Sequence, residues 1–239
     1  MTTSHYGTTG LLKNSQGQIV SQKVKFKVVL VYLALVLDNI LLTVVVPIIP
    51  IFLYQNEALE RNLTLQKSKG ILDEFIEDEF IAEKSEGLMV SENSRIGALF
   101  ASKAFVQLIF NPLVGKATII FGYDIPFLIG TSILLVSSLI FTFVTSFHWL
   151  FAARSLQGIA SSSIAVAGMG MVANLFEEDK ERSKAMGLVL GGIASGVLIG
   201  YPLGGILFDF VGETSPFIMM DIAITIVFRK YYNRCFLDF

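Results

Sequence analysis

The sequence predicts an all-α membrane protein, built as a bundle of about six transmembrane helices. Hydrophobic residues make up 53% of its 239 residues, charged residues make up only 16%, and the mean hydropathy is +0.66. A soluble domain has about 25% charged residues. The apolar residues gather in long runs, and about 20 residues of helix are needed to cross a bilayer. Glycine is as abundant as phenylalanine, with 20 residues each, which suits closely packed membrane helices.

Six apolar segments follow one another along the chain, and each is interpreted as a helix that crosses the membrane. They comprise residues 28–54, 95–116, 125–146, 149–173, 185–208 and 216–228. The first is too long for the apolar core of a cleavable signal peptide, so we expect a signal anchor that stays in the protein. The sixth is the weakest prediction, because it is short and contains Asp221.

Three polar segments flank these helices. Residues 1–27 are rich in Ser, Thr, Gly and Gln and are expected to form a disordered tail, and residues 229–239 form a second, short tail. The loop 55–94 is acidic and is expected to be solvated and partly helical. It contains the glycosylation sequence Asn62-Leu63-Thr64, and its use is left open because so short a sequence often occurs by chance.

Lysine and arginine are distributed unevenly between the two sides of the predicted bundle. With the N-terminus in the cytoplasm, the far side carries Arg61, Lys67, Lys69 and Lys84. The cytoplasmic side then carries Lys13, Lys23, Lys25, Lys27, Lys116, Lys180, Arg182, Lys184, Arg229, Lys230 and Arg234. An excess of positive charge marks cytoplasmic segments. The asymmetry therefore predicts a cytoplasmic N-terminus and an even number of spans, which supports counting the sixth.

Three ionisable side chains lie inside the predicted spans: Asp38, Lys103 and Arg154. Each costs about 2.5–3.5 kcal/mol at the centre of a membrane helix, so such residues usually have a function or a partner. Asp38 lies about 15 Å into the first helix, near the midplane of the bilayer. We expect its carboxylate to bind an organic cation, to carry a proton, or to do both in turn. A structural ion pair with Lys103 or Arg154 is the alternative.

Two further patterns surround these charges. Lys103 belongs to a stripe on one helix face, whose other members are Phe100, Gln107 and Asn111. We expect this stripe to line a transport path, and simple helix packing is the alternative. Arg154 and Gln157 stand one turn apart near the start of the fourth segment. We expect Arg154 to have a functional role; the alternative is that its side chain extends to the nearby membrane surface.

The fifth segment carries glycine at every fourth position. The residues of this series are Gly192, Gly196, Gly200 and Gly204. They predict a smooth helix face that another helix approaches closely, and Pro202 is expected to bend the helix near its end. Such a face suits either a sliding contact or a static interface, and spacing alone does not choose between them.

Several stretches of the chain resemble the major facilitator superfamily and, within it, the vesicular monoamine transporters. The stretches are LDNILLTVVVPIIP, IGALFASKAFVQLIFNPLVG, ARSLQGIASS, VAGMGMVA, ERSKAMGLVLGG and GYPLGGILFDFVGETSPF. Together they cover the first segment and most of residues 95–218. The resemblance implies a proton-coupled antiporter that loads monoamines into secretory or synaptic vesicles, with the proton as coupling ion and no other cofactor.

The resemblance also implies roles for particular residues. Asp38 and Asn39 match the pair that binds the substrate ammonium, and Phe100 matches an aromatic residue near the substrate path. Lys103 matches a lysine that pairs with an aspartate in the second half of the family fold. Ala165 stands where the acetylcholine branch carries an acidic residue, which favours monoamines. The residues expected to serve gating and packing are Arg154, Gln157, Gly196, Gly200, Pro202 and Gly204.

The chain departs from the family in pattern and in length. Residues 115–122 lack the usual charged pattern, Tyr201 replaces the first proline of the fifth-helix motif, and residues 229–239 match nothing. The family fold has twelve helices in two six-helix halves, with the site between them. Residues 28–228 correspond to the N-terminal half, so we expect a truncated product in which Lys103 lacks its partner.

Three functions stay open at this point. The first is a monoamine antiporter that needs a second half or a second copy, and the second is an antiporter for drugs or other organic cations. The third is a membrane protein that transports nothing and associates with a full-length transporter. The net charge of −2 argues against nucleic-acid binding, and without a nucleotide motif, metal cluster or catalytic triad we expect no enzyme.

Overall fold

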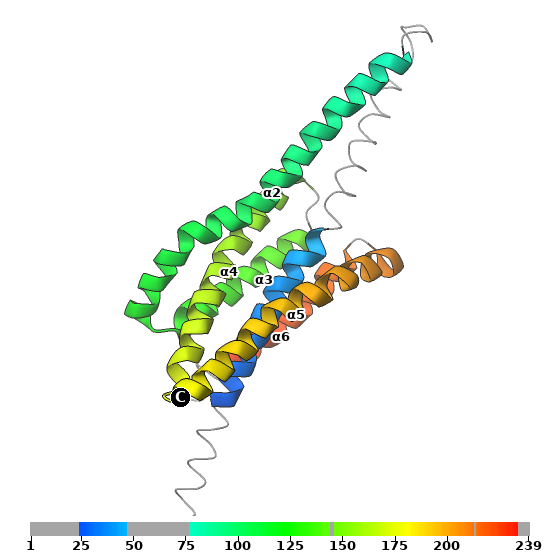
Figure 1. The fold of residues 1–239 in the computed structure, drawn as a ribbon. Coiled ribbons are helices and arrows are strands. Elements are labelled where there is room, and N and C mark those ends of the chain that lie inside the picture. The colour runs from blue at the N-terminus through cyan, green and yellow to red at the C-terminus, as the bar shows by residue number, and fades with distance from the viewer. Residues whose placement is uncertain (1–23, 47–76, 144–145, 213, 234–239) are drawn as a thin grey trace, which may run out of the picture.

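The computed structural model describes residues 24–46, 77–143, 146–212 and 214–233, and these residues are almost entirely helical. A first helix, Val24–Val46, is followed by five others (Figure 1). They are α2 (Glu77–Phe121), α3 (Asp124–Phe143), α4 (Phe147–Leu175), α5 (Asp179–Val211) and α6 (Ser215–Tyr232). The prediction of an all-α membrane protein with six helices is confirmed.

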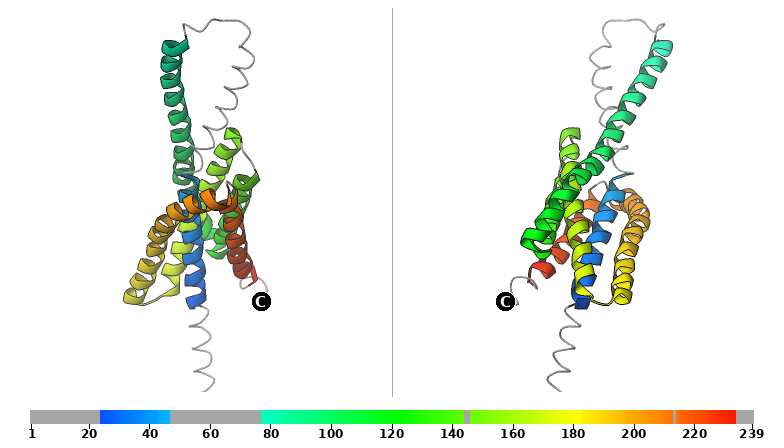
Figure 2. Two further views of the ribbon diagram at one scale, coloured as in Figure 1. Left: turned by 90° about the vertical axis from the view of Figure 1, so that its right-hand side faces the viewer. Right: turned by 60° about the vertical axis from the view of Figure 1, so that its left-hand side comes forward.

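Five of these helices are long and apolar enough to cross a membrane: the first helix and α2 to α5. The sixth, α6, has 18 residues, or about 27 Å of helix, and carries Asp221, Arg229 and Lys230. It packs beside α3, and Figure 2 shows it (red) running back from the end of α5 along the bundle. That α6 crosses the membrane stays a prediction.

Helix α4 lies at the centre of the bundle. It contacts α2, α3 and α5, and its buried residues are mostly Ala, Ser and Gly. Small side chains let the neighbouring helix backbones approach closely, which is how helices associate in a bilayer. A continuous apolar core joins α4 to the first helix, α3 and α6. Helix α4 therefore sets the positions of the inward-pointing side chains on the neighbouring helices.

Several predicted boundaries change. The predicted tail 1–27 is too long, because the helix already begins at Val24; Phe26 packs against the core and Lys27 pairs with Asp124. The segment 55–94 is helical from Glu77 onward, because α2 begins there and continues into the predicted second span. Residues 229–232, predicted to belong to the second tail, are part of α6, and the basic residues in its last turn complement the helix dipole. Asn62 lies outside the described residues.

The glycine series of α5 faces the first helix, as the spacing predicts for a closely approached face. All four glycines are buried. A Cβ atom added at Gly196 would lie 2.7 Å from the carbonyl oxygen of Val36 and 2.9 Å from the Cβ of Asn39. Pro202 lies inside α5, and Figure 2 shows the orange end of this helix turned out of line with its yellow part.

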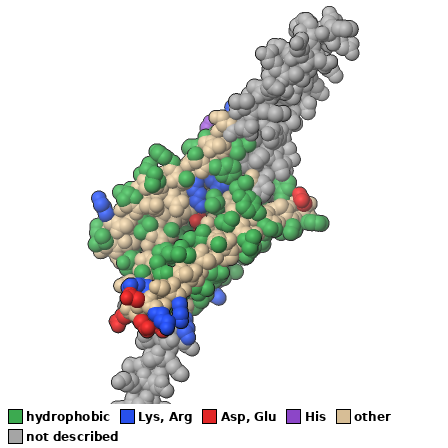
Figure 3. Space-filling view, in the orientation of Figure 1, with side chains coloured by type: hydrophobic (Ala, Val, Ile, Leu, Met, Phe, Trp, Pro, Cys, Tyr) green, Lys and Arg blue, Asp and Glu red, His purple; other side chains and the backbone are tan. Residues whose placement is uncertain are grey.

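Charged residues gather at one end of the bundle. There the Nζ of Lys27 on the first helix lies 2.9 Å from the Oδ1 of Asp124 on α3, and the hydroxyl of Tyr231 on α6 donates to the same oxygen at 2.6 Å. Figure 3 shows charged side chains at the lower end and a largely hydrophobic flank above them. Three helix ends are thus joined by one carboxylate on the side where the sequence predicts the cytoplasm.

Candidate functional site

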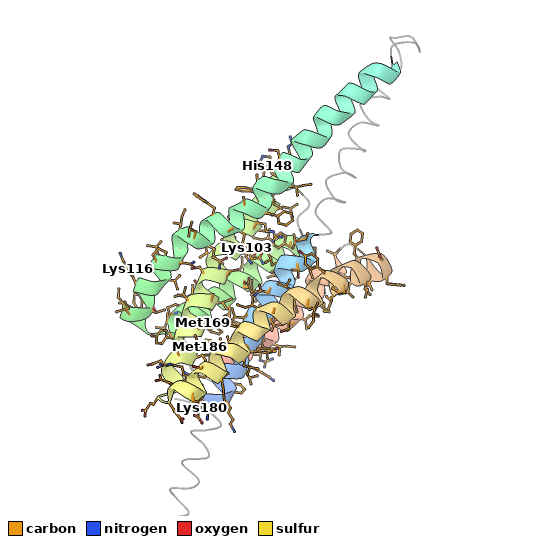
Figure 4. The ribbon with its side chains drawn as sticks, viewed as in Figure 1. Lys103, Lys116, His148, Met169, Lys180 and Met186 are labelled. Carbon is orange, nitrogen blue, oxygen red and sulfur yellow. The ribbon has the colours of Figure 1, made fainter. Side chains whose placement is uncertain are left out.

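A pocket of about 270 Å³ lies among the first helix, α2, α4 and α5. Its lining includes all four residues predicted to bind substrate: Asp38, Asn39, Phe100 and Lys103. The other lining residues are Leu35, Leu42, Ala104, Gln107, Ser161, Ala165 and Ile193. Figure 3 shows charged atoms in a hollow on an otherwise hydrophobic flank, and Figure 4 places Lys103 between α2 and the first helix.

Asp38 is the acidic group of this pocket, and it is only 5% exposed. The hydroxyl of Ser161 on α4 donates a hydrogen bond of 2.7 Å to its Oδ1. The Nζ of Lys103 on α2 lies 3.6 Å from the same oxygen. The carboxylate is therefore held by two other helices, which fixes its position inside the bundle.

Lys103 has a partner within this half of the fold. Its ion pair with Asp38 corrects the expectation that it is orphaned, and it realises the ion-pair alternative stated for Asp38. The side chain is 6% exposed, so it does not reach out to the membrane surface. Burial of one charge without the other costs far more than burial of the pair, which is why both lie together.

Asn39 and Phe100 complete the predicted set, and both line the pocket together with the charged pair. The Nδ2 of Asn39 donates to the carbonyl of Leu35 at 2.8 Å, so its amide oxygen is left to face other groups. The ring of Phe100 is half-buried and lies beneath the guanidinium of Arg154, with 5.1 Å between Cζ and the ring centroid. Both residues line the pocket and contribute an uncharged polar group and an aromatic face.

Arg154 and Gln157 are buried but do not line the pocket. Both are completely buried, which excludes the alternative that Arg154 extends to the membrane surface. An Arg154 Nη atom donates to the Oε1 of Gln157 at 2.9 Å, and the other donates to the carbonyl of Leu42 at 3.3 Å. The guanidinium also lies 5.8 Å from the ring centroid of Phe141. These contacts join α4 to the first helix, α2 and α3.

Comparison with known proteins identifies the family. Residues 29–231 match the Major Facilitator Superfamily. The chain belongs to this superfamily. It is 39% identical to the synaptic vesicular amine transporter of Homo sapiens, over 82% of this chain and 46% of that protein. It is 38% identical to the chromaffin granule amine transporter of Rattus norvegicus, over 83% of this chain and 47% of that protein.

The acetylcholine branch is similar as well. The vesicular acetylcholine transporter of Torpedo marmorata is 38% identical over 84% of this chain and 40% of its own length. The chain therefore spans about half the length of the curated relatives it matches. Its superfamily comprises membrane transporters rather than enzymes, and the recognition made from the sequence stretches is confirmed.

Two glycines of this superfamily member set the width of the site. Gly158 on α4 faces α2, where an added Cβ would lie 2.6 Å from the carbonyl oxygen of Lys103. Gly196 on α5 faces the first helix beside Asn39. Because only glycine permits these approaches, the two residues bring Lys103 and Asp38 into one pocket. Gly158 directly follows Gln157 in the chain, but no pattern in the sequence assigns it a position in the site.

Sequence reasoning missed Ser161 and the apolar lining. Ser161 is one of three consecutive serines, and only the fold shows that its hydroxyl, rather than that of Ser162, meets Asp38. Leu35, Leu42 and Ile193 are indistinguishable in the sequence from lipid-facing residues of the same helices. A signal did exist for Gln107, which stands on the polar stripe and lines the pocket.

Proposed function

We propose that this chain binds protonated monoamines at Asp38 and provides the N-terminal half-site of a proton-coupled vesicular antiporter. One observation carries the proposal: a buried carboxylate, an amide, an aromatic ring and a lysine, selected from the sequence, line the same pocket. The similarity to amine transporters supports amines as the class of substrate.

The chemistry of the pocket suits an ammonium group attached to an apolar body. The carboxylate of Asp38 would meet the ammonium, while the Phe100 ring and the apolar side chains of Leu35, Leu42 and Ile193 would contact the rest of the molecule. Coupling to protons follows if Asp38 takes up a proton when the amine leaves and releases it when the next amine binds. No cofactor is needed for this exchange.

A second protein surface would complete the site. Of the five helices that are long enough to cross a membrane, α2 and α5 have the smallest share of buried residues, and residues of both helices line the pocket. A charged pocket open to lipid would be costly, so we propose that a second half-transporter covers it, either in a longer chain or in another molecule. The membrane of a secretory or synaptic vesicle, with the N-terminus in the cytoplasm, is the proposed location.

Uptake into sealed vesicles tests this function. Vesicles that contain only this chain would be energised with an acidic interior and given labelled serotonin or dopamine, beside the Asp38→Asn variant. Asp209→Asn, at an exposed carboxylate near the end of α5, is the matched control. Uptake that only Asp38→Asn abolishes supports the proposal. Absence of uptake by the wild-type protein contradicts transport by this chain alone and favours association with a full-length transporter.

A further inference from the structure

The two polar contacts of Asp38 differ in length. Both fall on Oδ1, with Ser161 at 2.7 Å and Lys103 at 3.6 Å. A charge-assisted hydrogen bond between an ammonium and a carboxylate is normally about 2.7–2.9 Å long, so the contact of Lys103 with Asp38 is longer than a direct hydrogen bond of this kind. The Oδ2 atom makes no hydrogen bond or ion pair with any residue that the structure describes.

We propose that Lys103 is a tethered cation that occupies the ammonium position on Asp38 while the pocket is empty, and yields it to the ammonium of a bound amine. The inference rests on the function proposed above. It adds a specific role for Lys103, which competes with the substrate instead of contacting it.

Electrostatics favours exchange over simultaneous binding. Lys103 and Arg154 are both buried near Asp38, so this region already carries two cationic side chains and one carboxylate among the described residues. If Lys103 stayed in place, the ammonium of a bound amine would be a third cation, and the Lys103 ammonium only a few ångströms away would repel it. If the amine displaces Lys103, the carboxylate stays paired with one ammonium throughout.

The lysine side chain has room to move. Its flexible four-carbon stem carries a compact charge, unlike the planar guanidinium of arginine. Gln107 stands one turn further along the same face of α2 and also lines the pocket, so its amide oxygen is available to the displaced ammonium. Ser161, with the shorter bond, would hold the carboxylate in place during the exchange.

Because Lys103 competes with the amine for Asp38, the apparent affinity for amine is the intrinsic affinity multiplied by the fraction of time that Asp38 is free. Lys103→Met removes the competitor and should tighten binding of labelled serotonin to the purified full chain by about tenfold, the factor expected if Asp38 is free about a tenth of the time. Lys103→Arg keeps the charge and adds a two-pronged donor, so it should weaken binding. Lys116→Met, at an exposed lysine of the same helix, is the control and should change nothing.

Two comparisons separate this inference from the function on which it rests. Loss of binding in Asp38→Asn without tighter binding in a folded Lys103→Met protein overturns the tethered cation and leaves the amine site intact. Wild-type affinity in Asp38→Asn overturns both. Should Lys103→Met fail to fold, ¹⁵N-lysine NMR of the wild-type protein decides: serotonin should shift the Nζ resonance assigned by Lys103→Arg, and an unchanged resonance contradicts the exchange.

Discussion

At the scale of single residues, the buried polar groups of this chain fall into those with partners and those without. Asp38 has Ser161 and Lys103, whereas the hydroxyl of Ser162 is buried and makes no hydrogen bond within the described residues. A hydrogen bond to a charged group contributes more to stability than one between neutral groups. Neighbouring serines on one helix are therefore expected to differ sharply in their contribution to the stability of the fold.

Ser161→Ala should destabilise the protein by about 1–2 kcal/mol, because a buried carboxylate loses its shortest hydrogen bond. Ser162→Ala removes a buried hydroxyl without a partner among the described residues and should leave the free energy of unfolding unchanged or raise it. Unfolding of both variants in mixed detergent micelles measures the difference. Equal destabilisation would show that Ser161 has no special role.

At the scale of helices, close approach is the feature that decides the packing. Gly196 of α5 meets the backbone of the first helix, while Gly191 of the same helix has open space around it. Gly196→Ala should cost about 1–3 kcal/mol, because the atoms it would meet are backbone and Cβ atoms that cannot rotate away. Gly191→Ala should be neutral or slightly stabilising, since alanine has the higher helix propensity. Thermal unfolding compares them, and similar effects of the two substitutions would contradict this packing.

The contact between α3 and α6 depends on a second polar pair. Thr142 donates a hydrogen bond of 2.7 Å to the Oδ2 of Asp221, whose Oδ1 is buried and has no partner among the described residues. Thr142→Val should destabilise the protein by about 1–2 kcal/mol by leaving the carboxylate unpaired. Adding Asp221→Leu should restore stability, because an apolar pair replaces a poorly satisfied polar one. If the double variant is less stable than Thr142→Val alone, the polar pair is needed for another reason.

The helices themselves could be predicted from the sequence because apolar length is a local property. The glycine series at 192–204 and the polar stripe around Lys103 also predicted which faces point inward. Partners could not be predicted in this way. Nothing in the spacing of Asp221 or Asp124 indicates that Thr142, Lys27 and Tyr231 lie beside them, since each pair joins helices that are distant in the chain.

At the scale of the whole molecule, the bundle has two chemically different ends. Figure 4 places Lys180 and His148 at opposite ends of the bundle. The side chains of His148 and of Glu178, which is close to Lys180 in the chain, are both exposed. The excess of lysine and arginine predicts that the Lys180 end faces the cytoplasm. In sealed vesicles with the cytoplasmic face outward, a membrane-impermeant thiol reagent should label Glu178→Cys and spare His148→Cys, both made in a Cys235→Ser background. The reverse pattern would contradict the orientation.

The pocket between the first helix, α2, α4 and α5 is the centre of the proposed function, in which Asp38 binds an amine. Equilibrium binding of labelled serotonin to the purified chain tests this claim most directly, because it requires neither a second half nor a proton gradient. We predict saturable binding that Asp38→Asn weakens at least tenfold, while Asp209→Asn leaves the affinity unchanged. Equal affinities for all three proteins would contradict the account, because they would show that the buried carboxylate has no part in recognising the amine.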